Sequence, residues 1–133
     1  MPKKSALHTV LVVDDEALIR WTLSEALGER GYEVTEAHDG RSALGAIEHA
    51  ERAFSVVLLD YRLPDSADLR LLDSIMRKMP DTQVIMMTAH NSPELTRGAL
   101  AMGAFRVINK PFEVENLTAL VEEASAAGAD GAH

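Results

Sequence analysis

Four short polar stretches carry the residue types needed to hold a metal ion and a phosphoryl group. They are Asp14-Asp15, Asp60, Thr88 and Lys110, and each stands at the end of an apolar run. Three carboxylates brought together would repel one another unless a cation lay among them. All-oxygen ligands favour a hard ion, most naturally Mg²⁺, which keeps several of its waters. A lysine and a hydroxyl beside that ion would complete a pocket for phosphoryl transfer, with one aspartate as the nucleophile.

Each of these residues also has an ordinary explanation when it is taken singly. An Asp or Thr after a strand usually serves a turn or caps a helix, and a lone Lys is most often a solvated surface charge. Glu16 is better explained by the positive end of a helix than by metal binding. The joint pattern is more specific than its members, provided that the fold brings the four stretches to one place.

The spacing of apolar residues predicts five strands that alternate with five helices. The strands are expected at 10–13, 33–36, 56–59, 84–87 and 105–108. The helices are expected over 17–30, after Gly40, between Pro64 and Pro80, from Pro93 to Gly103, and around Leu117 to Ala124. This alternation predicts an α/β, doubly wound (βα)5 domain whose parallel sheet has helices on both faces. Right-handed crossovers then place every strand's carboxyl end on the same edge, where ligands bind.

Composition sets limits on the class of protein. The chain has 133 residues, a net charge of −8 and no cysteine, which fits one domain without disulfides, thiolate zinc sites or a cysteine nucleophile. The surplus of acid argues against direct nucleic-acid binding by this domain. The apolar run from Val10 to Val13 stops at Asp14, too soon for a secretory signal or a membrane span. We therefore expect a cytoplasmic location and no membrane contact.

Four motifs together resemble the receiver domain of two-component response regulators. They are spread over residues 8–124, and they read Val10-Leu-Val-Val-Asp-Asp-Glu16, Val57-Leu-Leu-Asp-Tyr-Arg-Leu-Pro64, Met87-Thr-Ala-His90 and Asn109-Lys-Pro-Phe112. Three stretches are further similar to receivers of nitrogen-regulator-like enhancer-binding activators, namely Ile19-Arg-Trp-Thr-Leu23, Asp60-Tyr-Arg-Leu-Pro64 and Thr88-Ala-His90. The resemblance implies a flavodoxin-like fold with strand order 2-1-3-4-5. It also implies a receiver at 8–124 between an N-terminal tail at 1–7 and, at 125–133, a tail or the start of a linker to an absent output domain.

The resemblance assigns the metal and acceptor roles. Asp60 would accept the phosphoryl group from a phosphohistidine of a sensor kinase. Asp15 would bind Mg²⁺ directly, Asp14 would bind it largely through water, and Asp60 and the backbone carbonyl of Arg62 would complete the protein ligands.

A second group of roles concerns the phosphoryl group. Lys110 would pair with the acceptor and then with the phosphoryl oxygens, Thr88 would turn inward to hydrogen-bond them, and the small Ala89 would leave room. The family's cis peptide would fall at Lys110-Pro111. Arg62 and His90 would tune how long the phosphoryl group survives, although a surface-loop histidine explains His90 equally well.

The chain departs from the family pattern at two positions. Val107 stands where the family often has the aromatic residue that reports the state of the threonine. In an alternating strand Phe105 and Val107 would share a side. We hypothesise that Phe105 cannot replace the missing switch, because it lies two residues further from the site; a change of its rotamer on phosphorylation would contradict this. Asp68 stands where many members have Gly, which bears on the loop conformation.

The expected function is a signalling switch that is not an enzyme but assists its own phosphorylation and dephosphorylation. Phosphorylation would shift the surface of the fourth helix, fifth strand and fifth helix, which would contact an output domain or a second copy in a homodimer. The main alternative is a phosphorylation-independent interaction module on the same fold. An aspartyl phosphatase is less consistent, since Tyr61-Arg62 supplies no second acid, and a nucleotide-binding domain lacks its glycine motifs.

Overall fold

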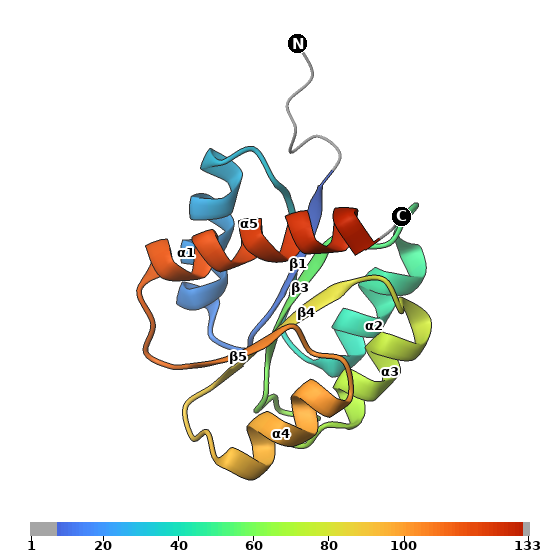
Figure 1. Ribbon diagram of the computed structural model, residues 1–133. Helices are drawn as coiled ribbons and strands as arrows, with labels where there is room; N and C mark the ends of the chain where they lie inside the picture. Colours follow the sequence, from blue (N-terminus) through green and yellow to red (C-terminus); the bar gives the residue numbers. More distant parts are fainter. Residues whose placement is uncertain (1–7, 132–133) are drawn as a thin grey trace.

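The computed structural model describes residues 8–131, so the expected N-terminal tail at 1–7 and the last two residues of the tail expected at 125–133 lie outside the described residues. Strands and helices alternate five times along this part of the chain (Figure 1), which confirms the predicted alternation. The strands are β1 (Thr9–Val13), β2 (Glu33–Ala37), β3 (Val56–Asp60), β4 (Gln83–Thr88) and β5 (Arg106–Asn109). The helices are α1 (Ala17–Glu29), α2 (Gly40–His49), α3 (Arg70–Lys78), α4 (Pro93–Ala101) and α5 (Val114–Gly131).

The five strands form one parallel sheet in the order β2-β1-β3-β4-β5. This is the order that the resemblance implies, with β1 at the point where the chain reverses its direction across the sheet. β3 is buried along its whole length, whereas the edge strands β2 and β5 are partly exposed. Central strands of a doubly wound sheet must be apolar on both sides, which explains the uninterrupted run from Val56 to Leu59.

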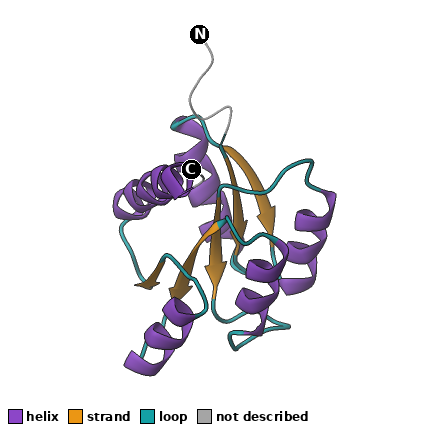
Figure 2. Ribbon diagram, turned by 45° about the vertical axis from the view of Figure 1, so that its right-hand side comes forward, coloured by secondary structure: helices purple, strands orange, loops and turns teal. Residues whose placement is uncertain are grey.

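Two hydrophobic cores lie on opposite faces of the sheet. One packs α1 and α5 against residues such as Val12 and Leu58, and the other packs α2, α3 and α4 against residues such as Leu11 and Leu59. Figure 2 shows these helices on both sides of the strands. Burial of both faces fixes the register of the central strands, because a shift by one residue would exchange the two cores.

The last helix is longer than the sequence predicts. A tail is expected from residue 125, but α5 continues to Gly131, so that expectation is wrong for the secondary structure of 125–131. Alanine is a strong helix former, and Ser125 is buried. A Cβ at Gly128 would lie 3.3 Å from Cγ of Gln83, so a small residue allows α5 to pack closely there. Within residues 8–131, no helix combines the length and apolar character that crossing a bilayer requires.

Candidate phosphoacceptor site

The predicted residues meet at the carboxyl edge of the sheet. Asp14 follows β1, Asp60 ends β3, Thr88 ends β4, and Lys110 follows β5. Because the strands are parallel and register-matched, Asp60 is opposite Met87 on the neighbouring strand, and Thr88 is opposite Asn109. The fold thus assembles groups that are nearly one hundred residues apart in the chain.

Three carboxylates form a cluster at this edge. Oxygen atoms of Asp14, Asp15 and Asp60 all lie within 4.8 Å of one another. Asp14 is fully buried, Asp60 is 6% exposed and Asp15 is exposed. Two buried carboxylates and one open to solvent suit a hard cation that keeps part of its water shell. The donor set therefore fits Mg²⁺, and Arg62, whose carbonyl the family resemblance assigns to the ion, lines the pocket that contains Asp15 and Asp60.

Lys110 supplies the positive charge between the buried carboxylates. Its Nζ lies 2.7 Å from Oδ2 of Asp14, 3.2 Å from Oδ2 of Asp60 and 3.8 Å from Oε1 of Glu16. Burial alone would lower the pKa of Lys110, but hydrogen bonds and charges from Asp14 and Asp60 outweigh it and raise the pKa. The ammonium stays charged, and the Lys110-Pro111 peptide is cis as expected.

The acceptor carboxylate has unusual electrostatics. Burial, and then the negative charge of Asp14, raise the pKa of Asp60 to about 6, against the opposing influence of Lys110 and of the Arg62 N–H. That N–H donates to Oδ1 of Asp60 at 3.3 Å. A metal ion among the carboxylates would relieve the repulsion that raises this pKa and would favour the ionised, nucleophilic form.

A pocket of about 490 Å³ opens above these groups. Thr88 is buried at its wall, and its Oγ1 accepts a hydrogen bond from the His90 N–H at 3.2 Å. Ala89 is the smallest lining side chain. Arg62 and His90 are exposed at the rim, where a water molecule could approach Asp60. All the residues that the sequence analysis assigns to the phosphoryl group therefore line one pocket or contact each other within it.

The region of the missing aromatic switch differs from expectation. Phe105 precedes β5 and packs with Ile108 in the core of α1 and α5, whereas Val107 packs in the opposite core. The expectation that Phe105 and Val107 share a side is wrong, because Phe105 lies outside the regular strand and strand alternation does not extend to it. The Arg106 guanidinium also stacks on the Phe105 ring at 4.7 Å. That Phe105 does not act as the switch stays a prediction.

The second departure, Asp68, is accommodated locally. No residue other than glycine has a positive φ within residues 8–131, so Asp68 needs no left-handed conformation. Its Oδ1 accepts a hydrogen bond from the Arg70 N–H at 2.9 Å, next to the start of α3. The loop therefore closes without the glycine that many family members have.

Sequence reasoning missed Arg20. Its Nη1 donates to the backbone carbonyl of Asp14 at 2.7 Å, and its Nε pairs with Glu36 on β2 at 3.3 Å. Arg20 thereby fixes the loop that carries the metal ligands to α1 and β2. A cation in the first turn of a helix opposes the helix dipole, and this was the available signal that Arg20 has another role.

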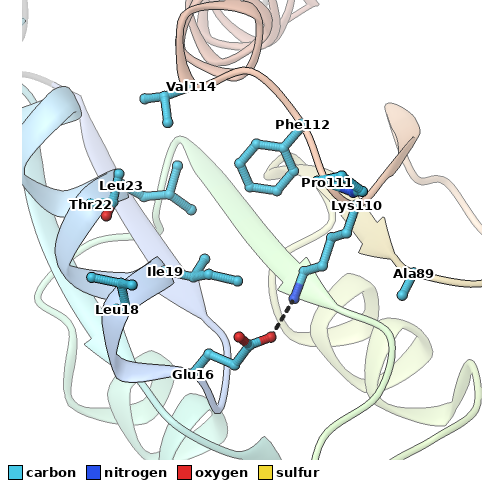
Figure 3. Close-up of a pocket in the computed structure, with 10 residues that line it drawn as sticks. All are labelled: Glu16, Leu18, Ile19, Thr22, Leu23, Ala89, Lys110, Pro111, Phe112 and Val114. Carbon is cyan, nitrogen blue, oxygen red and sulfur yellow. Dashed lines mark ion pairs between the residues drawn. The ribbon is translucent and has the colours of Figure 1, made fainter.

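An apolar groove of about 460 Å³ adjoins the acceptor pocket. Figure 3 shows Phe112 and Lys110 from the loop after β5 facing Ile19 and Leu23 of α1. The groove and the pocket share Glu16, Ala89 and Lys110 in their walls. A protein bound along the groove would therefore lie directly beside the acceptor.

Comparisons with known proteins agree with this geometry. Residues 10–122 match the model of the response regulator receiver domain family. The DNA-binding transcriptional regulator NtrC of Salmonella typhimurium is 39% identical over 115 residues, which are 86% of this chain but 24% of that protein.

Solved structures show the same likeness. A CheY-like receiver domain protein from Methanospirillum hungatei JF-1 matches with a TM-score of 0.87 and 30% identity, over 94% of this chain and 98% of that one. NtrX from Brucella abortus matches with a TM-score of 0.79 and 37% identity, over 90% of this chain and 26% of that one. The chain thus spans about a quarter of the length of NtrC. It belongs to the response regulator receiver domain family.

Proposed function

We propose that this receiver is a phosphorylation-controlled switch that accepts a phosphoryl group on Asp60 from a sensor histidine kinase. The observation that carries the proposal is the position of Lys110, whose Nζ bridges the buried carboxylates of Asp14 and Asp60 beside a third carboxylate. A structural ion pair would not need the excess negative charge. The excess is what a divalent cation and a transferred phosphoryl group would use.

The chemistry follows from the arrangement of the residues. An Asp60 oxygen would attack the phosphorus of a phosphohistidine, forming a P–O bond as the P–N bond breaks, while the leaving imidazole takes up a proton. Mg²⁺, held by Asp14, Asp15, Asp60 and the carbonyl of Arg62, would neutralise charge on the phosphoryl oxygens. Lys110 would move its ion pair from the Asp60 carboxylate to the phosphoryl group, and Thr88 would give up its contact with His90 to donate to it.

Loss of the phosphoryl group would use the same pocket. Arg62 and His90 stand at its rim, so they would control how a water molecule reaches the acyl phosphate. The domain would in this way assist its own phosphorylation and dephosphorylation. Thr88 connects this chemistry to α4 and β5, because the Lys110 N–H donates to its carbonyl and His90 leads into α4.

We further propose the surface through which the kinase docks. Leu18 and Trp21 on α1 are 73% and 61% exposed. Leu18 lines the apolar groove that shares its wall with the acceptor pocket, and Trp21 lies three residues further along the same helix. A donor protein must bring its phosphohistidine to Asp60 and so must cover this edge. Exposed apolar groups next to the acceptor give such a donor something to bind.

The output is proposed from the relatives. NtrC is named as a DNA-binding transcriptional regulator, and this chain matches about a quarter of it. We propose that the switched surface of α4, β5 and α5 controls an output region of that kind in the cytoplasm. Nucleic-acid contact would be made by that region and not by this acidic domain.

The test is phosphorylation of the purified chain by a small-molecule phosphodonor, with and without Mg²⁺, followed by intact mass. We expect an adduct of one phosphoryl group that needs Mg²⁺ and that Asp60→Asn abolishes. Asp68→Asn removes an exposed carboxylate from the same loop and should leave the adduct unchanged. A folded, Mg²⁺-binding protein that forms no adduct from this donor or from a kinase would favour the phosphorylation-independent module instead.

A further inference from the structure

The first three N–H groups of α2 donate hydrogen bonds to two different carboxylates. Asp39, the N-cap residue, accepts from Ser42 at 2.8 Å in a capping box. Asp65 reaches the same helix end from a distant part of the chain: its Oδ1 accepts from the Gly40 N–H at 2.8 Å and its Oδ2 from the Arg41 N–H at 3.0 Å. The local carboxylate satisfies only the Ser42 N–H, and the Gly40 and Arg41 N–H groups are satisfied by a residue 24 to 25 positions away in the chain.

Asp65 belongs to the loop that follows the phosphoacceptor. It lies in a tight turn closed by two backbone hydrogen bonds, from Leu63 to Ser66 at 2.7 Å and from Ser66 to Leu63 at 3.2 Å. The Leu63 side chain is buried in the core, and the Tyr61 N–H donates to the Met87 carbonyl on β4 at 2.8 Å. The segment that contains Arg62 is therefore held on β4, in the core and, through Asp65, on α2.

The neighbouring helix is shaped for this contact. A Cβ at Gly40 would lie 3.1 Å from Oδ1 of Asp65 and 3.3 Å from Cδ2 of Leu71. A side chain here would press on both neighbours, so glycine leaves the carboxylate room to approach the helix end at hydrogen-bonding distance. Gly40 and Asp65 thus form a matched pair, and both hydrogen bonds are charge-assisted at the positive end of a helix.

We propose that Asp65 is a positioning residue for the phosphoacceptor site, holding the Arg62 carbonyl in place by clamping the loop to the N-terminus of α2. The inference rests on the proposed function, because it gives Asp65 its role in Mg²⁺ binding and phosphorylation. Residues outside the ligand set commonly change metal affinity tenfold or more through such positioning. Asp65 is exposed, so we expect a smaller effect here.

The experiment compares Asp65→Ala with Asp39→Ala by calorimetric titration with Mg²⁺. Both variants remove a carboxylate from the same end of α2, but Asp65 alone is joined to the acceptor loop. We expect Asp65→Ala to weaken Mg²⁺ binding roughly three- to tenfold, Asp65→Asn to have an intermediate effect, and Asp39→Ala to leave the affinity unchanged. Circular dichroism and thermal melting would show whether each variant is folded.

A second readout separates positioning from loss of stability. The Mg²⁺ concentration for half-maximal phosphorylation by a small donor should rise in Asp65→Ala, while the rate at saturating Mg²⁺ stays near that of the wild type. Equal losses of affinity in the Asp39 and Asp65 variants, or none in a folded Asp65→Asn or Asp65→Ala, would overturn the proposal. If the wild type binds Mg²⁺ but forms no adduct, the proposed function fails, and the titration still decides the role of Asp65.

Discussion

At the scale of single residues, the site is a balance of like charges around one ammonium. Asp14 and Asp60 are both buried, and Lys110 can neutralise only one of them. The uncompensated negative charge disfavours ionisation of Asp60, and burial together with Asp14 raises the pKa of Asp60 to about 6. The protein therefore carries a cost at neutral pH that a bound cation would remove.

This cost predicts a pH-dependent difference between the wild type and Asp60→Asn without metal. Because the pKa of Asp60 is raised above its ordinary value of 3.8 in the folded state, protonation stabilises the fold below about pH 4. That contribution is lost as the pH rises through about 6. We expect Asp60→Asn to gain about 1–3 kcal/mol over the wild type between roughly pH 4 and pH 7.5, after allowance for solvent screening.

Urea unfolding in a chelator at the two pH values measures the difference. Saturating Mg²⁺ should reduce this difference in unfolding free energy at the higher pH, because the ion binds only the folded wild-type site. Asp68→Asn, which removes an exposed carboxylate from the same loop, is the control and should follow the wild type. If the unfolding free energies of the wild type and Asp60→Asn changed in parallel with pH, ionised Asp60 would not be destabilised by burial and Asp14.

At the scale of elements, the sequence predicts what local patterns encode. The apolar runs that end in Asp14, Asp60 and Thr88 define the central strands, and parallel topology alone then brings these residues to one edge. Side-chain contacts between elements that are distant in the chain leave no periodic or motif pattern in the sequence from which they could be predicted. The contacts of Arg20 with Asp14 and of Asp65 with α2 were therefore missed.

Two element boundaries were mispredicted for a related reason. The small residues after Ala124 suggest a tail by composition, but packing against β4 extends α5 through them. Phe105 was assigned to the last strand because it is apolar, but its side chain belongs to the core of α1 and α5. Tertiary packing decides the outcome at Phe105, and in α5 it acts together with the helix propensity of alanine.

At the scale of elements, the exposed face of α1 is predicted to bind the sensor kinase. Leu18→Ala and Trp21→Ala should each slow phosphorylation by a sensor kinase about tenfold, because exposed apolar anchors beside the reacting group dominate such contacts. Phosphorylation by a small donor should be unchanged, since neither residue lines the acceptor pocket. The matched control is Leu100→Ala, which truncates an exposed leucine on α4.

The measurement compares initial rates of phosphorylation of each variant by two donors. One donor is a kinase that phosphorylates the wild type, and the other is the small phosphodonor. Equal slowing with both donors would mean that the substitutions disturb the acceptor site. Unchanged kinase rates in both α1 variants would place the docking surface elsewhere.

At the scale of the whole molecule, exposed apolar residues form two surfaces on different helices. One is the α1 face beside the acceptor. The other includes Leu100 on α4 and Met102 just after its end, which are 45% and 41% exposed. A groove between the loop after β5 and α5 contains Phe112 and Leu120, and it shares Phe112 with the groove beside α1. A kinase would then act at α1 while the surface at α4 serves the proposed output.

The second surface predicts phosphorylation-dependent dimerisation. Each copy carries a net charge of −8, and a phosphoryl group adds more, so long-range repulsion opposes association. Self-association on phosphorylation would therefore require a new apolar contact, and α4 with β5 and α5 offers it.

Sedimentation velocity should detect dimers of the phosphorylated wild type and monomers of phosphorylated Leu100→Glu. Leu18→Glu places the same charge on the other surface and should still dimerise. Added salt should strengthen the dimer by screening the repulsion, whereas dimers that weaken with salt, or that persist in Leu100→Glu, would indicate an interface of ion pairs at a different face.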